Sequence, residues 1–386
     1  MRDGKPHVLF IVSRCPACGT VNVLLDILRH CSAEDFSFSL ITTLPEYPGN
    51  SVLPEFTARM EHVFVPMSNF RGLFGFWGDL KKAVDRLDPD VIHSTWVVPD
   101  RIISRFYPER QLMILHSDFL PDYAYSYGFL PGLALTWLHL RAARRANTAV
   151  AVSGSLAGIF REKYRMDVPF VRNGVTVPET PATDRRALRE KLGLPAGGTV
   201  FVYAAAFSRR KNQDFLIEAF EKGPADGPLL VLLGEGPDLP RLRKKHKNAK
   251  KTLFAGYVSN VGDYLDAADY YVSASRSEGL PLSVLEAMAH GLPPLLSDIP
   301  QHREIVSLAD GGGECFSQND EASLREALRR LLRKDRAKAS ESCRETVRRY
   351  FSAEAMSSAY QDYYKRIREE GENRVGRKDQ RRRSRP

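Results

Sequence analysis

Strand-like and helix-like stretches alternate along most of the chain, and this alternation limits the fold more than any other feature. The first strand-like run, HVLFIVS at residues 7–13, is apolar almost throughout, as expected for a strand buried on both faces. Runs such as DVIHST, LMILHS and TAVAVS follow it, and helical stretches such as FWGDLKKAVDRL separate several of them. Alternating strands and helices indicate a parallel sheet with helices on both faces.

The alternation stops once and then begins again, which divides the chain into two parts. Residues 177–198 are rich in proline, glycine and charge, and we interpret them as a linker with a short helix. A second series opens with TVFVYAAAF. The sequence therefore predicts an α/β protein with two Rossmann-like parallel-sheet domains that face a central cleft, one over 1–176 and one over 199–350.

Size and composition fit this architecture. The chain has 386 residues, which is long for one domain, and its 43% hydrophobic and 27% charged residues are ordinary for a globular protein. No apolar run reaches the roughly 18 residues of a membrane-spanning helix. The start, MRDGKPHVLFIVS, has too short an apolar core for a secretory signal, so we expect a cytoplasmic protein.

The C-terminal end is strongly basic. The net charge of the chain is +9, and much of the excess lies in NRVGRKDQRRRSRP. We expect a helix over 351–370 that crosses back to the N-terminal domain, followed by a disordered basic tail over 371–386. Two interpretations of the tail are open. It is either simply solvated, or it is attracted to an anionic partner, which could be lipid headgroups or an acidic polymer.

Cysteine usage indicates a reducing compartment. Five cysteines are too few for a disulfide framework in a chain of this length. Cys15 and Cys18 form C-P-A-C, which fits a redox pair, but small residues in a tight loop after the first strand are the preferred explanation. No second pair completes a zinc site.

A longer signature lies in the second half of the chain. The string YYVSASRSEGLPLSVLEAMAHGLPPLLSDIPQHREIV resembles that of retaining GT-B glycosyltransferases of the glycosyl transferases group 1 family. RKNQDFLIEAF, LLGEGPDLPRLRKK, TLFAGYVSNVGDYLDAADYY, VRNGV and ILHSDF also stand where that family has its motifs. The resemblance is strong in the C-terminal half and loose in the N-terminal half. It implies a GT-B fold, with an N-terminal acceptor domain and a C-terminal donor domain.

The same resemblance implies an activity. It is the transfer of a sugar from a nucleotide diphosphate sugar, for which a UDP-sugar is favoured, to a hydroxyl of a glycan or lipid-linked glycan. The configuration at the anomeric carbon is retained. No cofactor and no metal is implied, and the catalytic residues are expected to be His116, Glu278 and Lys211.

The stretch SEGLPLSVLEAMAHG explains how such a donor could be held. Pro281 suits the first turn of a helix that runs to about His290, with Gly291 as its stop. The backbone N–H groups at the start of that helix then form an anion site at the positive end of the helix dipole. The donor-binding residues expected there are Gly279, Leu280, Pro281 and Ser283.

Two glutamates flank this helix start. The resemblance implies that Glu278 contacts the donor sugar and that Glu286 binds the ribose diol. A carboxylate in an apolar helix face requires a partner, which argues against an ordinary capped helix. Gly279 lets the backbone approach the ligand closely.

The diphosphate requires cations. In the resembled family a lysine and an arginine a few residues earlier neutralise it; the lysine is Lys211 here, but Ala206 stands at the arginine position. Arg209 or Arg210 could supply the missing charge, and Arg209 is the one we select. A solvated R-R-K turn is the alternative.

Further donor contacts are expected from loops after strands. Gly234 and Gly236 end a strand where small residues allow a backbone or a ligand to approach closely. The resemblance places the nucleotide base beside the loop that begins with Tyr257 and Val258.

In the N-terminal half, the resemblance places His116 near the reacting sugar, whereas His93 is expected to be structural. Gly19, followed by Thr20, stands where the family has a glycine-rich loop near the donor phosphate or the acceptor. Ser153 and residues 172–174 are expected at the cleft, although a plain turn explains Asn173-Gly174 equally well.

Metal and partner expectations follow. Asp88-Pro89-Asp90 is the only D-x-D and is interpreted as a loop, so no metal is expected. Residues 119–145 combine aromatics with a basic helix, which suits either an anionic membrane surface at the inner face of the plasma membrane or a loop packed on its own domain. Nucleic acid is not an expected partner.

Three other functions compete with glycosyl transfer. A non-catalytic sugar-nucleotide or polysaccharide-binding GT-B protein is the main alternative, favoured mildly by Ala206 and opposed by Glu278, Lys211 and His116. A second alternative is a GT-B sugar-nucleotide epimerase, but that class does not have the two glutamates that flank the helix start here. A nucleic-acid binder is suggested only by the basic tail.

Overall fold

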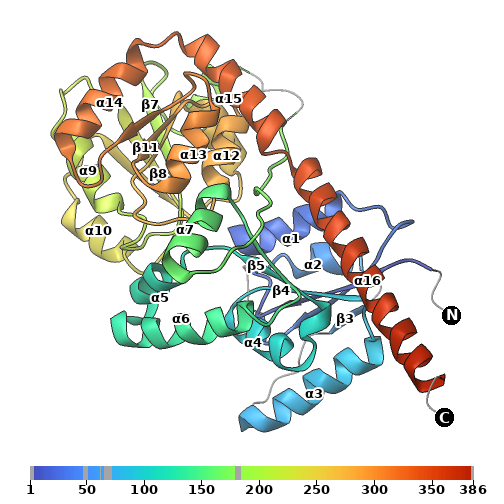
Figure 1. Cartoon of the computed structure of the whole chain (residues 1–386). Helices are drawn as coiled ribbons and strands as arrows, with labels where there is room; N and C mark the ends of the chain where they lie inside the picture. The colour runs from blue at the N-terminus through green and yellow to red at the C-terminus, as the bar shows by residue number, and fades with distance from the viewer. Residues whose placement is uncertain (1–3, 47–50, 61, 65–71, 179–183, 384–386) are drawn as a thin grey trace. The chain divides into compact units, whose positions relative to one another are not determined.

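The chain forms two compact units. The computed structural model describes residues 4–46, 51–60, 62–64, 72–178 and 184–383. Unit 1 consists of Met1–Arg172 and Ala353–Pro386, and unit 2 of Asn173–Ser352. The last segment of the chain therefore belongs to the same unit as the first (Figure 1).

Unit 1 is built on a parallel sheet. Over the described residues its strand order is β3-β2-β1-β4-β5-β6, and every pairing is parallel. This is the order of a doubly wound nucleotide-binding fold, in which the direction of winding reverses between β1 and β4. The strands are β1 (His7–Val12), β2 (Ser37–Thr42), β3 (His62–Phe64), β4 (Val91–Ser94), β5 (Gln111–Leu115) and β6 (Thr148–Ala151).

Helices cover this sheet because each carries one apolar face. Leu80 and Val84, one turn apart in α3, pack with Leu9 and Ile92 of the sheet in a buried cluster. The helices of unit 1 are α1 (Gly19–Arg29), α2 (Leu53–Thr57), α3 (Gly72–Leu87), α4 (Val97–Phe106), α5 (Phe119–Tyr127), α6 (Phe129–Ala143), α7 (Gly154–Tyr164) and α16 (Ala353–Arg383), with a short 3₁₀ turn at Pro108–Arg110.

The long helix α16 packs into unit 1. Tyr360 and Tyr364 are fully buried, and the Tyr364 hydroxyl lies 2.6 Å from Nδ1 of His93. The Ser357 hydroxyl donates to the carbonyl oxygen of Ile27 in α1 at 2.9 Å. These contacts fasten the end of the chain to the core of unit 1.

The basic end differs from the disordered tail that the sequence predicted from residue 371. In the structure α16 continues to Arg383. Arginine, lysine and glutamate are good helix formers. Pairs one turn apart, Arg368 with Glu372 at 2.9 Å and Arg374 with Glu370 at 3.3 Å, support the helix beyond the part that packs on the core.

Unit 2 repeats the same topology. Over the described residues its parallel strands lie in the order β12-β11-β10-β7-β8-β9, with the reversal between β7 and β10. The strands are β7 (Val200–Ala204), β8 (Leu229–Leu233), β9 (Thr252–Gly256), β10 (Tyr270–Ser273), β11 (Pro294–Ser297) and β12 (Glu314–Phe316). The helices are α8 (Arg185–Lys191), α9 (Gln213–Glu221), α10 (Leu239–Lys245), α11 (Val261–Ala267), α12 (Leu282–Ala289), α13 (Pro300–Leu308), α14 (Glu321–Arg333) and α15 (Arg336–Tyr350).

The segment predicted as a linker is part of unit 2 over its described residues. Arg189 of α8 is 5% exposed and donates to Asp269 at 2.7 Å and to the carbonyl of Ala267 at 2.9 Å. Arg185 contacts the other oxygen of Asp269 at 2.7 Å. The proline- and charge-rich composition suggested a linker, but these arginines pair with a half-buried carboxylate. Residues 179–183 lie outside the described part.

Replacing Arg189 should therefore destabilise unit 2. We expect Arg189→Ala to lower the free energy of unfolding by about 3 kcal/mol, the lower end of the range for breaking a buried pair, because Arg185 still neutralises Asp269. Urea denaturation followed by circular dichroism measures this loss. Arg186→Ala, at an exposed position of the same helix, is the control. Equal stability of the two variants would contradict the assignment of α8 to the core.

Candidate active site

Two loops meet where the strand order of unit 2 reverses. One follows β7 and carries Arg210 and Lys211, and the other follows β10 and carries Glu278. The backbone N–H of Arg276 donates to the carbonyl oxygen of Arg210 at 2.8 Å, which ties the loops together. Ligands of open α/β sheets bind at such a switch point, beyond the carboxyl ends of the strands.

A buried carboxylate lies between two cations at this point. Glu278 is 6% exposed. One of its oxygens accepts a hydrogen bond from Nζ of Lys211, and the other accepts one from the Arg210 guanidinium at 2.9 Å. Arg210 also donates to the carbonyl oxygen of Ser277 at 2.8 Å. These three side chains carry one net positive charge, so the group can still attract an anion.

The electrostatics keep Glu278 ionised. Burial by itself raises the pKa of this carboxyl, but Lys211 and Arg210 outweigh burial and hold the pKa well below its usual range. The Ser275 hydroxyl donates to the same carboxylate and lies 2.9 Å from the hydroxyl of Tyr203, a fully buried residue. Glu278 is therefore a fixed negative charge in a network that reaches the sheet.

Helix α12 begins directly after this loop. It spans Leu282–Ala289, with Pro281 as the N-cap, His290 as the C-cap and Gly291 at a φ of 78°. The sequence predicted these bounds to within one residue at each end. The first N–H groups of a helix have no acceptor within it, so α12 directs its positive end at the loop that carries Glu278.

One face of α12 is polar. Ser283, Glu286 and His290, spaced three and four residues apart, are half-buried, whereas most of the helix is buried. The Tyr271 hydroxyl donates to the Ser283 hydroxyl at 2.8 Å. Nδ1 of His290 lies 2.6 Å from a carboxylate oxygen of Asp266. Glu286 therefore lies on the accessible side of α12, one turn from its start.

The structure selects a different arginine from the one that the sequence analysis selected. Arg209 is exposed and Ala206 is exposed, whereas the Arg210 side chain lies on Glu278. The turn after β7 sends neighbouring side chains in different directions, and only Arg210 and Lys211 point to the carboxylate. Arg210 thus replaces Arg209 as the candidate for the missing family arginine.

The two glycines after β8 have a structural reason. Gly234 and Gly236 have φ values of 125° and 154°, and a Cβ on either would lie 2.3 Å from the Ala205 carbonyl oxygen or 2.4 Å from that of Phe207. A side chain at either position would collide with the loop after β7. The sequence predicted that either a backbone or a ligand approaches these glycines closely, and in the structure it is a backbone.

The remaining loop residues of unit 2 are more exposed. Tyr257, directly after β9, is 54% exposed, and Val258 is half-buried. Leu280 is buried, and its carbonyl oxygen accepts from the side chain of Asn173 at 3.1 Å. Asn173, which the sequence also explained as a turn residue, is 4% exposed and braces the loop before α12.

In unit 1, His116 follows β5 and is half-buried. Its Nε2 has no hydrogen-bond partner among the described residues. Burial, with a smaller effect of His139, lowers the pKa of His116 to about 3, so the ring is neutral. His93 is fully buried against Tyr364, which fits the predicted structural role.

Two other unit 1 candidates, Gly19 and Ser153, lie at helix starts. Gly19 is exposed and is the first residue of α1. The Ser153 hydroxyl caps α7 by accepting from the N–H of Leu156 at 3.1 Å. The Arg172 guanidinium lies over the ring of Phe170, 5.1 Å from its centroid.

Sequence reasoning missed His302 of α13. It is completely buried, and its Nδ1 lies 2.8 Å from the carbonyl oxygen of Ser297, while Nε2 has no partner among the described residues. Burial lowers the pKa of His302 to about 4, although the charge of Glu278 opposes this shift. Its position at the start of the helix after β11 was the available signal.

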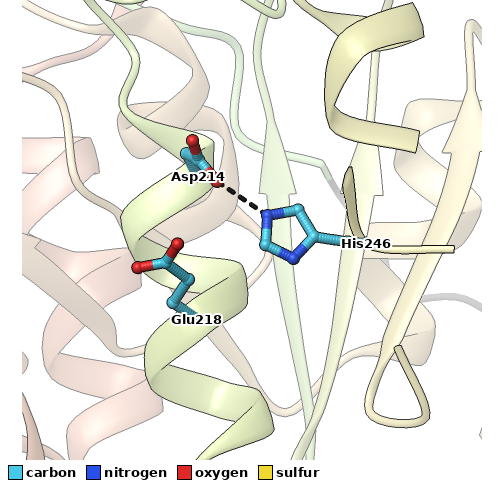
Figure 2. Close-up of side chains that lie close together, drawn as sticks. All are labelled: Asp214, Glu218 and His246. Atoms are coloured by element: carbon cyan, nitrogen blue, oxygen red, sulfur yellow. Dashed lines mark hydrogen bonds and ion pairs between the residues drawn. The ribbon is translucent and has the colours of Figure 1, made fainter. Parts of the chain in front are cut away.

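One cluster on unit 2 has side chains that could in principle hold a metal ion. The ligand atoms of Asp214, Glu218 and His246 lie within 4.8 Å of one another (Figure 2). Nζ of Lys245, however, lies 2.8 Å from Asp214 and 2.6 Å from Glu218. Despite partial burial, these ion pairs and the His246 hydrogen bond lower the pKa of Asp214 to about 2. Lys245 and Arg241 thus already compensate the two carboxylates, and we assign no metal to the cluster.

Two other sequence motifs have structural explanations. Burial raises the pKa of Cys15 to about 12 and raises that of Cys18, which disfavours the reactive thiolate of a redox pair. Asp90 accepts from the backbone N–H of His7 at 2.8 Å, and Asp88 pairs with Arg110 at 2.6 Å. The D-x-D therefore lies in a loop at the amino end of β4, away from the carboxyl ends of the strands.

Both parts of the chain match families of glycosyltransferases. Residues 184–350 match the family described as glycosyl transferases group 1, and residues 17–177 match glycosyltransferase family 4. The two matches together cover most of both units. Both matched families are glycosyltransferase families, so the chain is similar to glycosyltransferases over most of its length. No helix among the described residues is long and apolar enough to cross a membrane.

Individual relatives agree with this assignment. TuaC of Bacillus subtilis, named for teichuronic acid biosynthesis, is 29% identical over 222 residues, which are 55% of this chain and 54% of TuaC. An Escherichia coli UDP-Gal:α-D-GlcNAc-diphosphoundecaprenol α-1,3-galactosyltransferase is 27% identical over 49% of each chain. The chain thus spans about half the length of these relatives.

Solved structures show the GT-B fold. HepE of Anabaena, determined in complex with UDP, superposes with a TM-score of 0.73 at 15% identity, covering 92% of this chain and 99% of that one. At this identity the likeness concerns the fold. The chain therefore has two parallel-sheet α/β domains of the GT-B class.

The buried ion pairs predict a pH dependence of stability. Because Glu278 has a folded-state pKa below its unfolded value of about 4.3, its ionised form stabilises unit 2 above that pH, and the contribution is lost as pH falls. We expect the stability difference between the wild type and Glu278→Gln in urea to be largest near pH 7 and to shrink towards pH 3. The control, Glu326→Gln at an exposed position, should differ little from the wild type throughout. A Glu278→Gln difference that is constant with pH would contradict the buried pairs.

Proposed function

We propose that this glycosyltransferase moves a sugar from a UDP-sugar to a hydroxyl of a glycan or lipid-linked glycan and retains the anomeric configuration. The observation that carries the proposal is the buried Glu278 held between Lys211 and Arg210 beside the start of α12. The relatives support the substrate class: one is named for a UDP-galactose donor and a diphosphoundecaprenol-linked acceptor, and HepE was determined with UDP.

In this proposal the donor diphosphate binds at the N-terminus of α12. The helix dipole and the first N–H groups attract its oxygens, and Lys211 and Arg210 turn from Glu278 to the phosphates. Gly279 and Ser283 contribute contacts at the same helix start. Glu286 accepts hydrogen bonds from the two ribose hydroxyls.

The remaining residues of the proposal contact the base and the sugar of the donor, or lie on the acceptor side. Tyr257 and Val258 border the uracil, and Gly234 keeps the neighbouring loop close enough to complete the pocket. Glu278 receives hydroxyls of the sugar once its cations have moved. His116, and the N-terminal turn of α1 with Gly19, belong to the acceptor side.

The chemistry breaks the bond between the anomeric carbon and the diphosphate oxygen and forms a bond from that carbon to the acceptor oxygen on the same face. The acceptor proton passes to the departing phosphate, so no protein nucleophile is required. Negative charge grows on the diphosphate in the transition state, and each preorganised donor there is worth about 3 kcal/mol. Because Lys211, Arg210 and the helix supply the positive charge, a metal is not part of the proposal.

A second candidate is a non-catalytic binder of sugar nucleotides. The alanine at position 206 favours it mildly, because the family arginine is absent there. Arg210 on Glu278 offers a replacement charge and weakens this alternative. Sugar transfer, or slow donor hydrolysis, separates an enzyme from a binder.

The expected place of action is the cytoplasm, with peripheral attachment to the inner face of the plasma membrane. This placement extends the substrate proposal, because a lipid-linked acceptor is confined to a membrane. The basic segments would contact its anionic lipids.

The proposed binding of the ribose by Glu286 can be tested directly. We expect Glu286→Ala to weaken UDP binding roughly 100-fold, since a carboxylate that accepts two hydrogen bonds from a diol loses both. Titration calorimetry with UDP and 2′,3′-dideoxy-UDP measures the effect. Loss of the two hydroxyls should weaken binding to the wild type and leave binding to Glu286→Ala unchanged.

Control variants complete the experiment. Glu326→Ala, on the exposed face of α14, should bind UDP normally. Glu278→Ala and His116→Ala should mainly lower turnover and keep nucleotide affinity. If Glu286→Ala bound UDP as tightly as the wild type, the ribose assignment would be wrong.

A further inference from the structure

An exposed apolar surface lies at the tip of a helical hairpin in unit 1. Helix α5 ends at Tyr127, Gly128 reverses the chain at a φ of 88°, and α6 begins at Phe129 beside it (Figure 1). Leu130 is 75% exposed. Monomeric proteins rarely leave such a group of large apolar side chains in water without a function. The hairpin tip consists of Tyr125, Tyr127, Phe129, Leu130, Leu133 and Trp137.

The exposure of the tip is not a result of loose packing. Gly132 of α6 lies so close to α5 that a Cβ there would be 2.8 Å from the backbone nitrogen of Ala124. Nε2 of the buried His139 lies 2.8 Å from Asp100, and its Nδ1 lies 2.6 Å from the Tyr123 hydroxyl. The hairpin is fastened to the body of unit 1 and presents the tip as a fixed surface.

Positive charge follows the apolar tip along the hairpin. Arg141, Arg144 and Arg145 are exposed near the end of α6, and Arg101 and Arg105 are exposed on α4, which packs against α6. At about 1.5 Å per residue, Arg141 lies roughly 16 Å along α6 from Leu130. In the segment 119–145 the only acidic residue is Asp122, which accepts a hydrogen bond from Ser117.

We propose that the hairpin tip inserts into the surface of an anionic lipid bilayer. Apolar faces of interfacial helices enter roughly 5–10 Å, to the boundary of headgroups and acyl chains. At that depth, and with the Debye length of about 8 Å at physiological salt, the arginines lie where they attract anionic headgroups. Aromatic side chains such as Trp137 suit this boundary because one part is apolar and the other polar.

The charges favour a lipid surface over a second copy of the chain. In a two-fold dimer through this face, each tip would meet the same tip, and the arginines of the two copies would approach one another. The segment has only Asp122 to compensate them. An anionic bilayer supplies both the apolar layer and the negative charge that the surface lacks.

This inference rests on the proposed lipid-linked acceptor for its purpose, but the surface can be tested without donor or acceptor. The full chain is sedimented with vesicles of phosphatidylcholine, with and without phosphatidylglycerol. We expect binding to the anionic vesicles, at least about tenfold less for Leu130→Ser/Trp137→Ser, and loss of the preference for phosphatidylglycerol in Arg141→Glu/Arg145→Glu. Each variant is also titrated with UDP, so that loss of the fold or of the proposed donor site is recognised separately.

Two matched variants serve as controls. Leu332→Ser changes an exposed leucine on α14 of unit 2 and should leave vesicle binding unchanged. Charge reversal of the basic end, Arg381→Glu/Arg382→Glu/Arg383→Glu, should leave most of the binding. Wild-type binding by the Leu130→Ser/Trp137→Ser variant, or loss of binding through the basic end alone, would overturn the proposal. So would a dimer that this double variant dissociates without any change in vesicle binding.

Discussion

A carboxylate buried between two cations is the interaction on which the candidate site depends. Glu278 is removed from water, and its ionised form persists only because Lys211 and Arg210 accompany it. This requirement fixes three side chains from two loops in one place. It also leaves one excess positive charge at the positive end of α12, so the ligand-free protein is already arranged for an anion.

The topology explains why these residues meet. The loops after β7 and β10 are neighbours because the strand order reverses between those two strands. Asn173 braces the loop before α12 through the carbonyl of Leu280, and the serine and tyrosine hydroxyls behind Glu278 connect it to the sheet. Under the proposed function, a donor diphosphate that competes with Glu278 for its cations would free that carboxylate for the sugar. One buried pair can thus couple donor binding to assembly of the reacting site.

The sequence predicted the parts of the fold that depend on local patterns. Buried parallel strands read as apolar runs, so both Rossmann-like series and the bounds of α12 could be found from residues alone. Composition gave a wrong prediction for the segment that contains Arg189. The segment has the composition of a linker, but Arg189 is buried and pairs with Asp269. The basic end was expected to be disordered, yet its residues continue α16.

Candidate site residues could be predicted where a sequence motif specifies them. They could not be predicted where the conformation of a turn decides which side chain points to the site. Glu278 and Lys211 were predicted together because the family signature carries them, and the structure pairs their side chains. Arg209 and Arg210 are adjacent, and only the backbone direction after β7 decides which one reaches Glu278, so sequence could not separate them. His302 was missed because its burial and its contact with Ser297 come from tertiary packing and not from spacing along the chain.

The most direct test of this account is the affinity of the cations for a diphosphate. Calorimetry would compare UDP with uridine on the wild type, Lys211→Met, Arg210→Met and Arg209→Met. The account predicts that UDP binds the wild type far more tightly than uridine does, that Lys211→Met and Arg210→Met lose most of this difference, and that Arg209→Met keeps it. An undiminished preference for UDP in both Lys211→Met and Arg210→Met would contradict it.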